Sequence, residues 1–348
     1  MSKHFIKKIE IEKFKCFKNF EAEGFSRVNL ITGKNNVGKT AFMEACFLLS
    51  NSFNIFKSHD SYSNNKGALG KFDRDWFHFE IVKLMLEVQQ NRENYTFFVQ
   101  WLKEESEFSF DDFKITINKK FQLKLNARAI CPNHYNVQAW GSWGGYFIDN
   151  FRRHKGYGKI YIKNNPPALN NHTFVSICNE SKKIHKLIGN LKINNNVDIL
   201  NNSLKKMFDC QELDVINDEI MLKVQGNFTR LSNFGDGIRH FINIFVILLS
   251  NKSDTIYLDE IDNGIHYSKL DELWEVILQT SKELDVQVFA TTHSKECIES
   301  YVRVAKKLED TGAGLIEFGK KDDQIQSIVL DYNEMISEVD SGMEVRGW

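Results

Sequence analysis

The sequence lacks any apolar run long enough to cross a bilayer. Its longest apolar stretch, residues 241–249, is interrupted by Asn243 and falls well short of the roughly 20 residues that a membrane-spanning helix needs. The first ten residues contain no long apolar segment followed by small residues, so no signal peptide is expected. These absences argue against a membrane protein and against a secreted one.

Cysteine is scarce and scattered. The chain has six cysteines, and no two of them form a C-x-x-C pair. Such pairs are typical of zinc sites and redox motifs, and disulfides belong to oxidising compartments. We therefore expect neither a structural zinc nor disulfides, and we predict a cytoplasmic protein.

Neither sign of charge is in excess. The chain has 45 Lys and Arg against 46 Asp and Glu, for a formal net charge of −1. Binding to nucleic acid or to a membrane surface through overall charge is thereby excluded, and any such contact must come from a local patch. Sustained heptads are also absent, which excludes a long coiled-coil arm. The length of 348 residues allows about two domains, or one domain with an insertion.

What the sequence does contain is a strand, a glycine-rich loop and a helix in immediate succession. A strand is predicted at 27–32 and a helix at 41–50, and the pattern G-x-x-x-x-G-K-T lies between them. Glycines let backbone N–H groups turn toward a phosphate, and the helix N-terminus adds positive potential. The lysine pairs with the β- and γ-phosphates and the threonine hydroxyl ligates Mg²⁺. The predicted ATP site consists of Gly33, Lys34, Asn35, Asn36, Val37, Gly38, Lys39 and Thr40.

Two further apolar strands end in polar residues. The first ends at Asp259, with Glu260 next in the chain, and the second is followed by His293. Ligands of open α/β sheets bind where the carboxyl ends of parallel strands meet. We expect Asp259 to hold Mg²⁺ together with Thr40, Glu260 to polarise the attacking water, and His293 to donate a hydrogen bond to the γ-phosphate. The alternatives are two carboxylates that cap a surface strand and a structural histidine.

The remaining pattern separates a β-rich segment from an α/β segment. Strand-like runs divided by polar turns occupy about residues 80–163 and predict antiparallel strands, and short helices are expected at 182–191 and 198–208. From about residue 236 helices alternate with strands, which predicts a parallel sheet with helices on its faces. The expected elements there are helices at 237–249, 269–284 and 295–307 and strands at 255–259 and 286–291.

These motifs, with the segments IEKFKCF at 11–17, LSNFGDGIR at 231–239 and DEIDNGIHYS at 259–268, resemble one family. It is the ABC-type ATPase head of RecF, SMC and OLD proteins, in the compact bacterial form of AAA-family ATPases. The resemblance implies an α/β P-loop NTPase fold of ABC-ATPase type, with a mainly parallel sheet core, an antiparallel β-layer and a small β/helical insertion. The head would comprise residues 1–50 and 225–348. Residues 51–224 would be an inserted β-rich region followed by a short helical lobe.

The resemblance also implies that two heads close on two ATP molecules. Each ATP would lie on the Walker A loop of one subunit and be closed by the signature segment of the other. The signature candidates in this chain are Ser232, Asn233, Gly235, Asp236 and Gly237. Asn233 and Phe234 depart from the usual Leu-Ser-Gly-Gly pattern, so Ser232 and Asn233 are both candidates for the side-chain contact.

Further residues are assigned by the same resemblance. Asp262 and His266 would form the D-loop at the dimer interface. A Q-loop glutamine is implied in the early insertion, where Gln89, Gln90 and Gln100 are candidates, and Lys13 or Lys15 is implied to contact nucleotide.

The implied activity is an ATP-driven switch, for which two roles are open. Stand-alone heads of this kind are similar to the ATPase subunits of bacterial anti-phage systems such as Septu and PARIS, in which a separate nuclease or toxin is the effector. The alternative is a RecF-like repair ATPase that contacts nucleic acid through a basic stretch, although a run of charges is more often a solvated face. This stretch consists of Arg152, Arg153, Lys155 and Lys159.

We expect ATP and Mg²⁺ as cofactors, a homodimer or a higher even oligomer, and slow ATP hydrolysis. No nuclease activity is expected, because the chain after Asp259 has no room for the metal-dependent domain that follows the ATPase in OLD nucleases. The acids of the insertion are assigned to polar turns with a solvated surface; they are Glu104, Glu105, Asp111 and Asp112.

Overall fold

The structure of the chain is a computed structural model. The described residues are 6–47, 107–117, 121–130, 157–163, 172–175, 181–193, 196–217, 219–250 and 255–342. They fall into two compact units. The first comprises residues 1–7, 22–40 and 171–348, and the second comprises residues 8–21 and 41–170.

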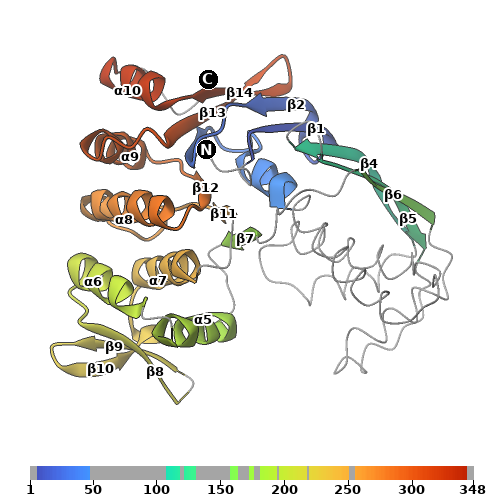
Figure 1. Ribbon diagram of the computed structural model, residues 1–348. Coiled ribbons are helices and arrows are strands. Elements are labelled where there is room, and N and C mark those ends of the chain that lie inside the picture. Colours follow the sequence, from blue (N-terminus) through green and yellow to red (C-terminus); the bar gives the residue numbers. More distant parts are fainter. Residues whose placement is uncertain are drawn as a thin grey trace. The chain divides into compact units, whose positions relative to one another are not determined.

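The first unit is built on a six-stranded sheet with the order β14-β13-β3-β12-β11-β7 (Figure 1). Five of its strands are parallel, and β14 pairs antiparallel with β13 at one edge. All residues of β3, β11 and β12 are buried, as expected of a parallel sheet that is covered by other elements. The strands are β3 (Val28–Gly33), β7 (His172–Val175), β11 (Thr255–Leu258), β12 (Gln287–Thr291), β13 (Ala313–Lys321) and β14 (Gln324–Leu330).

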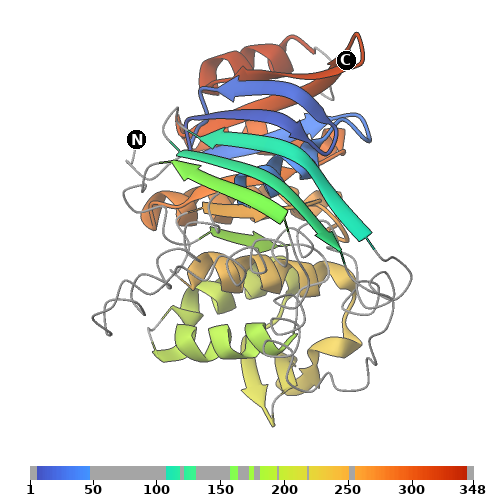
Figure 2. The ribbon, with the colours of Figure 1, turned by 90° about the vertical axis from the view of Figure 1, so that its right-hand side faces the viewer.

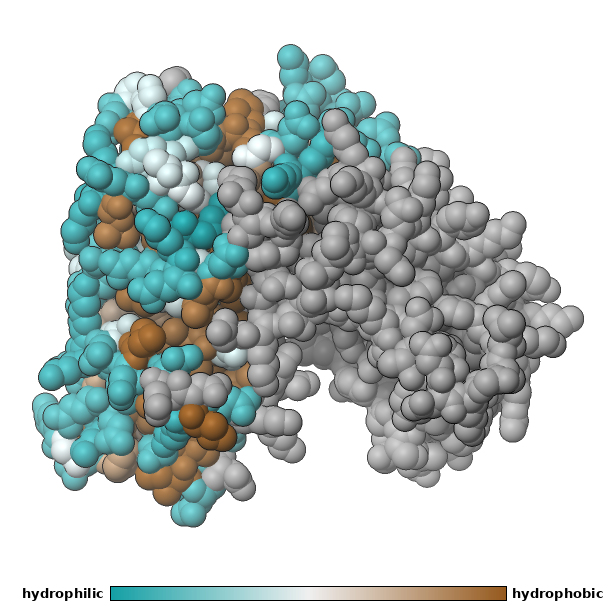
Figure 3. Space-filling view, in the orientation of Figure 1, coloured by the Kyte–Doolittle hydropathy of each residue, from teal (hydrophilic) through white to brown (hydrophobic). Residues whose placement is uncertain are grey.

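Four helices lie in a row along this sheet in Figure 1, and their outer side is largely polar over α8 to α10 in Figure 3. They are α7 (Asp236–Leu249), α8 (Leu270–Glu283), α9 (Lys295–Lys307) and α10 (Tyr332–Asp340). The predicted alternation of helices and strands after residue 236 is confirmed, with ends within one or two residues. The sequence did not identify the β13–β14 hairpin or α10, which begins with a capping box of Asp331 and Glu334.

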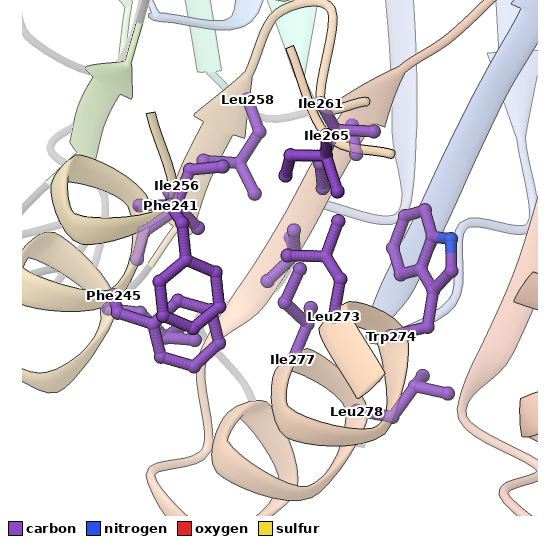
Figure 4. Close-up of a cluster of buried hydrophobic side chains, with 14 of the residues drawn as sticks. Phe241, Phe245, Ile256, Leu258, Ile261, Ile265, Leu273, Trp274, Ile277 and Leu278 are labelled. Atoms are coloured by element: carbon purple, nitrogen blue, oxygen red, sulfur yellow. The ribbon is translucent and has the colours of Figure 1, made fainter. Parts of the chain in front are cut away.

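The core of this unit lies between the helices and the sheet (Figure 4). Phe241 and Phe245 of α7 stack with ring centroids 4.2 Å apart. They lie beside Ile256 of β11, and Trp274 and Ile277 of α8 belong to the same cluster. Each of these side chains is at most 1% exposed. Burial of a side chain of this size contributes about 1.5–3 kcal/mol, so the cluster fixes α7 and α8 against β11.

Residues 181–230 form a lobe of two helices and a small sheet. Helices α5 (Ser181–Ile193) and α6 (Val197–Phe208) confirm the two predicted helices. The antiparallel sheet of β8 (Glu212–Ile216), β9 (Glu219–Val224) and β10 (Asn227–Arg230) was not predicted. Ile188 and Leu204 join the same core as α7, so these helices belong to the compact unit that carries the Walker A loop. The predicted bounds of the insertion, residues 51–224, stay a prediction.

The second unit contains an antiparallel sheet with the order β2-β1-β4-β5-β6, whose strands run side by side in Figure 2. Its strands are β1 (Lys8–Phe14), β2 (Phe17–Glu23), β4 (Glu107–Ile117), β5 (Phe121–Ile130) and β6 (Tyr157–Lys163). The antiparallel layer that the sequence predicted is thereby confirmed. Strands predicted at 83–89 and 95–101 lie outside the described residues.

One assignment in this unit is corrected. Asp111 and Asp112 lie within β4 and not in a polar turn. The register of β4 against β5 shifts between Phe110 and Phe113, where one extra residue is accommodated. Such a bulge places a polar pair inside a strand, which the alternation of a regular strand does not reveal.

None of the helices among the described residues is long and apolar enough to span a membrane.

A buried ion pair joins three elements of the first unit. The Arg27 guanidinium, just before β3, pairs with the carboxylate of Asp310, just before β13. The same guanidinium donates to the Leu278 carbonyl at 3.2 Å and to Ser281 Oγ at 3.2 Å, both on α8. The two charged side chains are 11% and 5% exposed. Removing one partner of such a pair leaves the other charge buried without a counter-charge.

We expect Arg27→Ala to lower the free energy of unfolding by about 3–5 kcal/mol, because Asp310 then remains buried without a cation. Urea denaturation followed by circular dichroism measures this loss. The double variant Arg27→Met, Asp310→Leu is the control and should lose much less. A change below about 1 kcal/mol for Arg27→Ala would show that the pair does not hold these elements together.

Candidate functional site

The glycine-rich loop connects β3 to a helix that spans residues 39–47, so the predicted succession of strand, loop and helix is confirmed. Gly33 has φ +138°, and a Cβ atom there would lie 2.5 Å from the Phe318 carbonyl oxygen and 2.9 Å from Val37. Only glycine fits this position. Gly38 has φ +89° and Asn36 φ +62°, so the backbone of the loop turns repeatedly into the left-handed region. Lys34, Asn35 and Asn36 are exposed and Val37 anchors the loop in the interior.

The Lys39 side chain is folded into this loop. Its Nζ donates to the carbonyl oxygens of Gly33 at 2.7 Å and Lys34 at 2.9 Å, and lies 3.2 Å from His293 Nδ1. Burial lowers the pKa of Lys39 to about 8, although the charges of Asp259 and Glu260 oppose this shift. The cation is therefore held without a full counter-charge, which a phosphate group would supply.

Thr40 and Asp259 meet at the start of the helix. Thr40 Oγ1 lies 3.2 and 3.3 Å from the two carboxylate oxygens of Asp259. A hydroxyl and a carboxylate are the hard oxygen donors that Mg²⁺ takes, and this ion usually completes its shell with waters and phosphates. The two side chains therefore fit the predicted Mg²⁺ site. The described residues contain no group of three or more His, Cys, Asp or Glu side chains that would hold a metal ion without a further ligand.

Glu260 follows the end of β11 in a left-handed backbone conformation, with φ +49°. Its N–H donates to Thr291 Oγ1 at 2.8 Å, and the N–H of Ile261 donates to the Thr291 carbonyl at 3.0 Å. The Glu260 charge raises the pKa of both Lys39 and His293, so the Glu260 carboxylate lies close enough to interact electrostatically with both side chains.

His293 lies just beyond the carboxyl end of β12 and is exposed. Partial burial lowers the pKa of His293, and the Lys39 charge lowers it further against Glu260 and Asp262. The ring is therefore neutral near pH 7 and carries one N–H donor. The next residue, Ser294, caps α9 by accepting from the Cys297 N–H at 3.1 Å, which fixes where the strand ends and the helix begins.

The predicted signature segment surrounds the N-terminus of α7. Ser232 and Asn233 form part of a 3₁₀ turn, Gly235 is the N-cap, and Asp236 lies in the first turn; all four are exposed. Gly237 differs, because it is buried and a Cβ atom there would lie 2.0 Å from the Gly264 carbonyl oxygen. Gly237 therefore packs against Gly264, in the segment predicted to be the D-loop.

The two predicted D-loop residues are also engaged within the subunit. Asp262 accepts a hydrogen bond from Thr292 Oγ1 at 2.7 Å. His266 is exposed, and its Nδ1 lies 2.9 Å from Ser268 Oγ. Their role at a dimer interface stays a prediction.

Sequence reasoning missed three residues that organise the site, namely Gly264, Thr291 and Thr292. The two threonines precede His293. The sequence pattern that could have identified them is a buried strand followed by hydroxyl side chains. Gly264 has φ +72°, and the glycine in DEIDNG was the corresponding signal.

Several predicted residues are not placed in the site. Gln89, Gln90 and Gln100 and the basic residues Arg152, Arg153 and Lys155 lie outside the described residues, and Lys159 lies on β6. The Lys15 ammonium forms an ion pair with Glu44 on the helix of residues 39–47.

Two comparisons with known proteins describe what the sequence is similar to. Residues 219–299 match the family described as "AAA domain, putative AbiEii toxin, Type IV TA system". The matched segment contains Asp259, Glu260 and His293. The chain is 25% identical to the "ATP/GTP phosphatase" of Helicobacter pylori (strain ATCC 700392 / 26695), over 92% of this chain and 93% of that protein.

Solved structures of SMC heads share the fold. One is an SMC head bound to the C-terminal winged-helix domain of ScpA, with a TM-score of 0.50, 13% identity, and coverage of 96% of this chain and 99% of that one. Another is the SMC head from Pyrococcus furiosus with an extended coiled coil, bound to the C-terminal domain of ScpA, with a TM-score of 0.50, 11% identity, and coverage of 97% and 99%. The chain therefore has the fold of the SMC ATPase heads, and its residues 219–299 are similar to the AAA-domain family.

Proposed function

We propose that the chain is an ATP-hydrolysing switch subunit that closes head-to-head with a second copy on ATP and controls a separate effector. The observation that carries this proposal is the convergence of two pairs at one edge of the sheet. Lys39 meets His293, and Thr40 meets Asp259, although these residues are far apart in sequence. Their chemistry matches a triphosphate with its metal ion.

The residues have separate tasks in this mechanism. The backbone N–H groups of the loop and the helix N-terminus bind the phosphates, and Lys39 turns from the loop carbonyls to the β- and γ-phosphates. Thr40 and Asp259 would hold Mg²⁺, which neutralises phosphate charge when bound. Glu260 orients the attacking water and takes its proton, and His293 donates a hydrogen bond to the γ-phosphate.

The closed dimer is supported by the exposure of the segment that would complete the site of a second copy. Ser232, Asn233, Gly235 and Asp236 are all accessible at the N-terminus of α7, a position that favours an anion. The family description that matches residues 219–299 names a toxin system, which agrees with a role in defence. We therefore propose an anti-phage switch in preference to a repair factor.

The first prediction concerns the charge of Lys39. Bound phosphates raise the pKa of Lys39. Above about pH 8 the free protein has lost the Lys39 proton, so ATP binding there must take up a proton. The Kd for Mg-ATP should be constant below about pH 7 and rise by up to about tenfold per pH unit above pH 8. Calorimetry across this range measures the change.

Two variants accompany this measurement. Lys39→Arg stays charged and should show a flat Kd above pH 8, whereas Lys39→Ala should bind ATP far more weakly at every pH. Equal Kd values for the wild type at pH 7.5 and 9.5 would refute the assignment of Lys39 to the phosphates.

The second prediction concerns the dimer. Glu260→Gln should bind Mg-ATP, hydrolyse it at least about a hundredfold more slowly, and accumulate as a dimer, because an amide does not take a proton from water. Light scattering with and without ATP measures the mass. Adding Gly235→Glu should abolish this dimer and leave ATP binding intact, since the new charge would face the γ-phosphate bound by the partner.

Gly235 is the informative position because it is exposed and a Cβ atom there would meet nothing within 4 Å. Gly237→Glu would instead collide with Gly264 of its own subunit. An ATP-dependent dimer that persists in the Gly235→Glu, Glu260→Gln protein would show that this segment does not close the site in trans.

The third prediction is that the purified chain hydrolyses ATP slowly and cuts no nucleic acid. A nuclease centre requires several carboxylates that converge on metal ions. Plasmid, linear DNA and RNA are incubated with the protein and Mg²⁺ or Mn²⁺, with and without ATP. Cleavage that appears when the product of the neighbouring gene is added supports the switch. Cleavage that is lost in Asp111→Asn, Asp112→Asn protein would refute it.

A further inference from the structure

Thr291 contacts three consecutive residues of the catalytic turn. It is the last residue of β12 and is 1% exposed. Its hydroxyl donates to Asp259 Oδ1 at 2.7 Å and accepts from the Glu260 N–H at 2.8 Å, while its carbonyl accepts from the Ile261 N–H at 3.0 Å. A hydroxyl has one donor and two acceptor positions, so one buried group fixes both carboxylate-bearing residues.

These bonds hold Glu260 in a conformation that it would not adopt alone. A non-glycine residue in the left-handed region is strained, and it persists only where its surroundings determine it. At Glu260 this backbone turns the chain out of β11. The direction of the Glu260 side chain therefore depends on the groups that hold the Glu260 N–H and carbonyl in place.

The second side of this turn faces helix α7. His240 is 5% exposed, and its ring faces the backbone of Glu260 and Ile261. Within the part of the chain that the structure describes, its Nε2 atom has no hydrogen-bond partner of normal geometry. One turn earlier on the same helix, Gly237 packs directly on Gly264. The turn is thus enclosed by β12 on one side and by α7 on the other.

We propose that Thr291 is a positioning residue that sets the direction of the Glu260 carboxylate, with His240 supporting the same turn from α7. This inference rests on the proposed ATPase function. Thr291 does not touch the nucleotide in this assignment, and its effect passes through the backbone of Glu260. The hydroxyl is the active part, because the backbone carbonyl of Thr291 is kept by any substitution.

The test compares Thr291→Val with Thr291→Ser. Valine keeps the shape and removes the hydroxyl, so kcat should fall at least tenfold while KM and the Kd for a non-hydrolysable ATP analogue change less than about twofold. Serine restores the hydroxyl and should return kcat to within about threefold of the wild type. Thr255→Val is the matched control, because Thr255 is a buried threonine of β11 whose hydroxyl has no partner among the described residues.

The outcomes separate the two proposals. A wild-type protein that binds the analogue without turnover contradicts the proposed hydrolysis. Thr291 is then tested by amide hydrogen exchange: the Glu260 N–H should exchange faster in Thr291→Val because it loses its acceptor, and unchanged exchange overturns the positioning role. Wild-type turnover with unchanged kcat in Thr291→Val overturns the positioning role. So does a loss of analogue binding as large as the loss of kcat. If Thr291→Val does not fold, Thr291→Ala supplies the same comparison, and His240→Phe should lower kcat with unchanged analogue binding.

Discussion

The parallel register of three strands is the constraint on which the site depends. Leu258 of β11 lies opposite Ala290 of β12, and Thr291 of β12 lies opposite Ile31 of β3. β11 and β12 therefore end within one residue of each other, and β3 continues two residues further to Gly33, so the residues that follow all three strands lie at one edge of the sheet. A shift of one residue in either pairing would turn the side chains to the opposite face and separate Asp259 from Thr40.

Electrostatics at this edge follow from burial. Lys39 lies among backbone carbonyls and a neutral ring, so the lowered pKa of this lysine records the cost of keeping a cation out of water. The same burial lowers the pKa of His293, and the lysine charge adds to the effect. Binding of a polyanion at this loop is therefore favourable, because its negative charge offsets the free-energy cost of burying the Lys39 cation.

The signature and the catalytic turn are not independent parts. The backbone of α7 at Gly237 approaches the backbone of Gly264 so closely that a larger residue at position 237 would collide with it. His240 lies one turn further along α7 and faces the turn of Glu260. The helix whose N-terminus faces outward is therefore packed on the turn that carries Glu260. In the proposed closed dimer, a second copy would contact a helix that packs on the turn of Glu260.

The sequence by itself determined the glycine-rich loop between a strand and a helix, the order of the elements from residue 236 to residue 307, and the positions of Asp259, Glu260 and His293 after the ends of two strands. These features are local, because glycine, lysine and threonine at fixed spacing and apolar runs of fixed period leave few conformations open. Only the tertiary structure decided that residues 181–230 pack with α7, that Asp111 and Asp112 lie in a strand, and that Gly237 faces Gly264. The same holds for Thr291, whose hydroxyl gains its partners from the turn after β11, more than thirty residues away. Contacts of this kind depend on which faces meet, and the period of a single segment does not specify its partner.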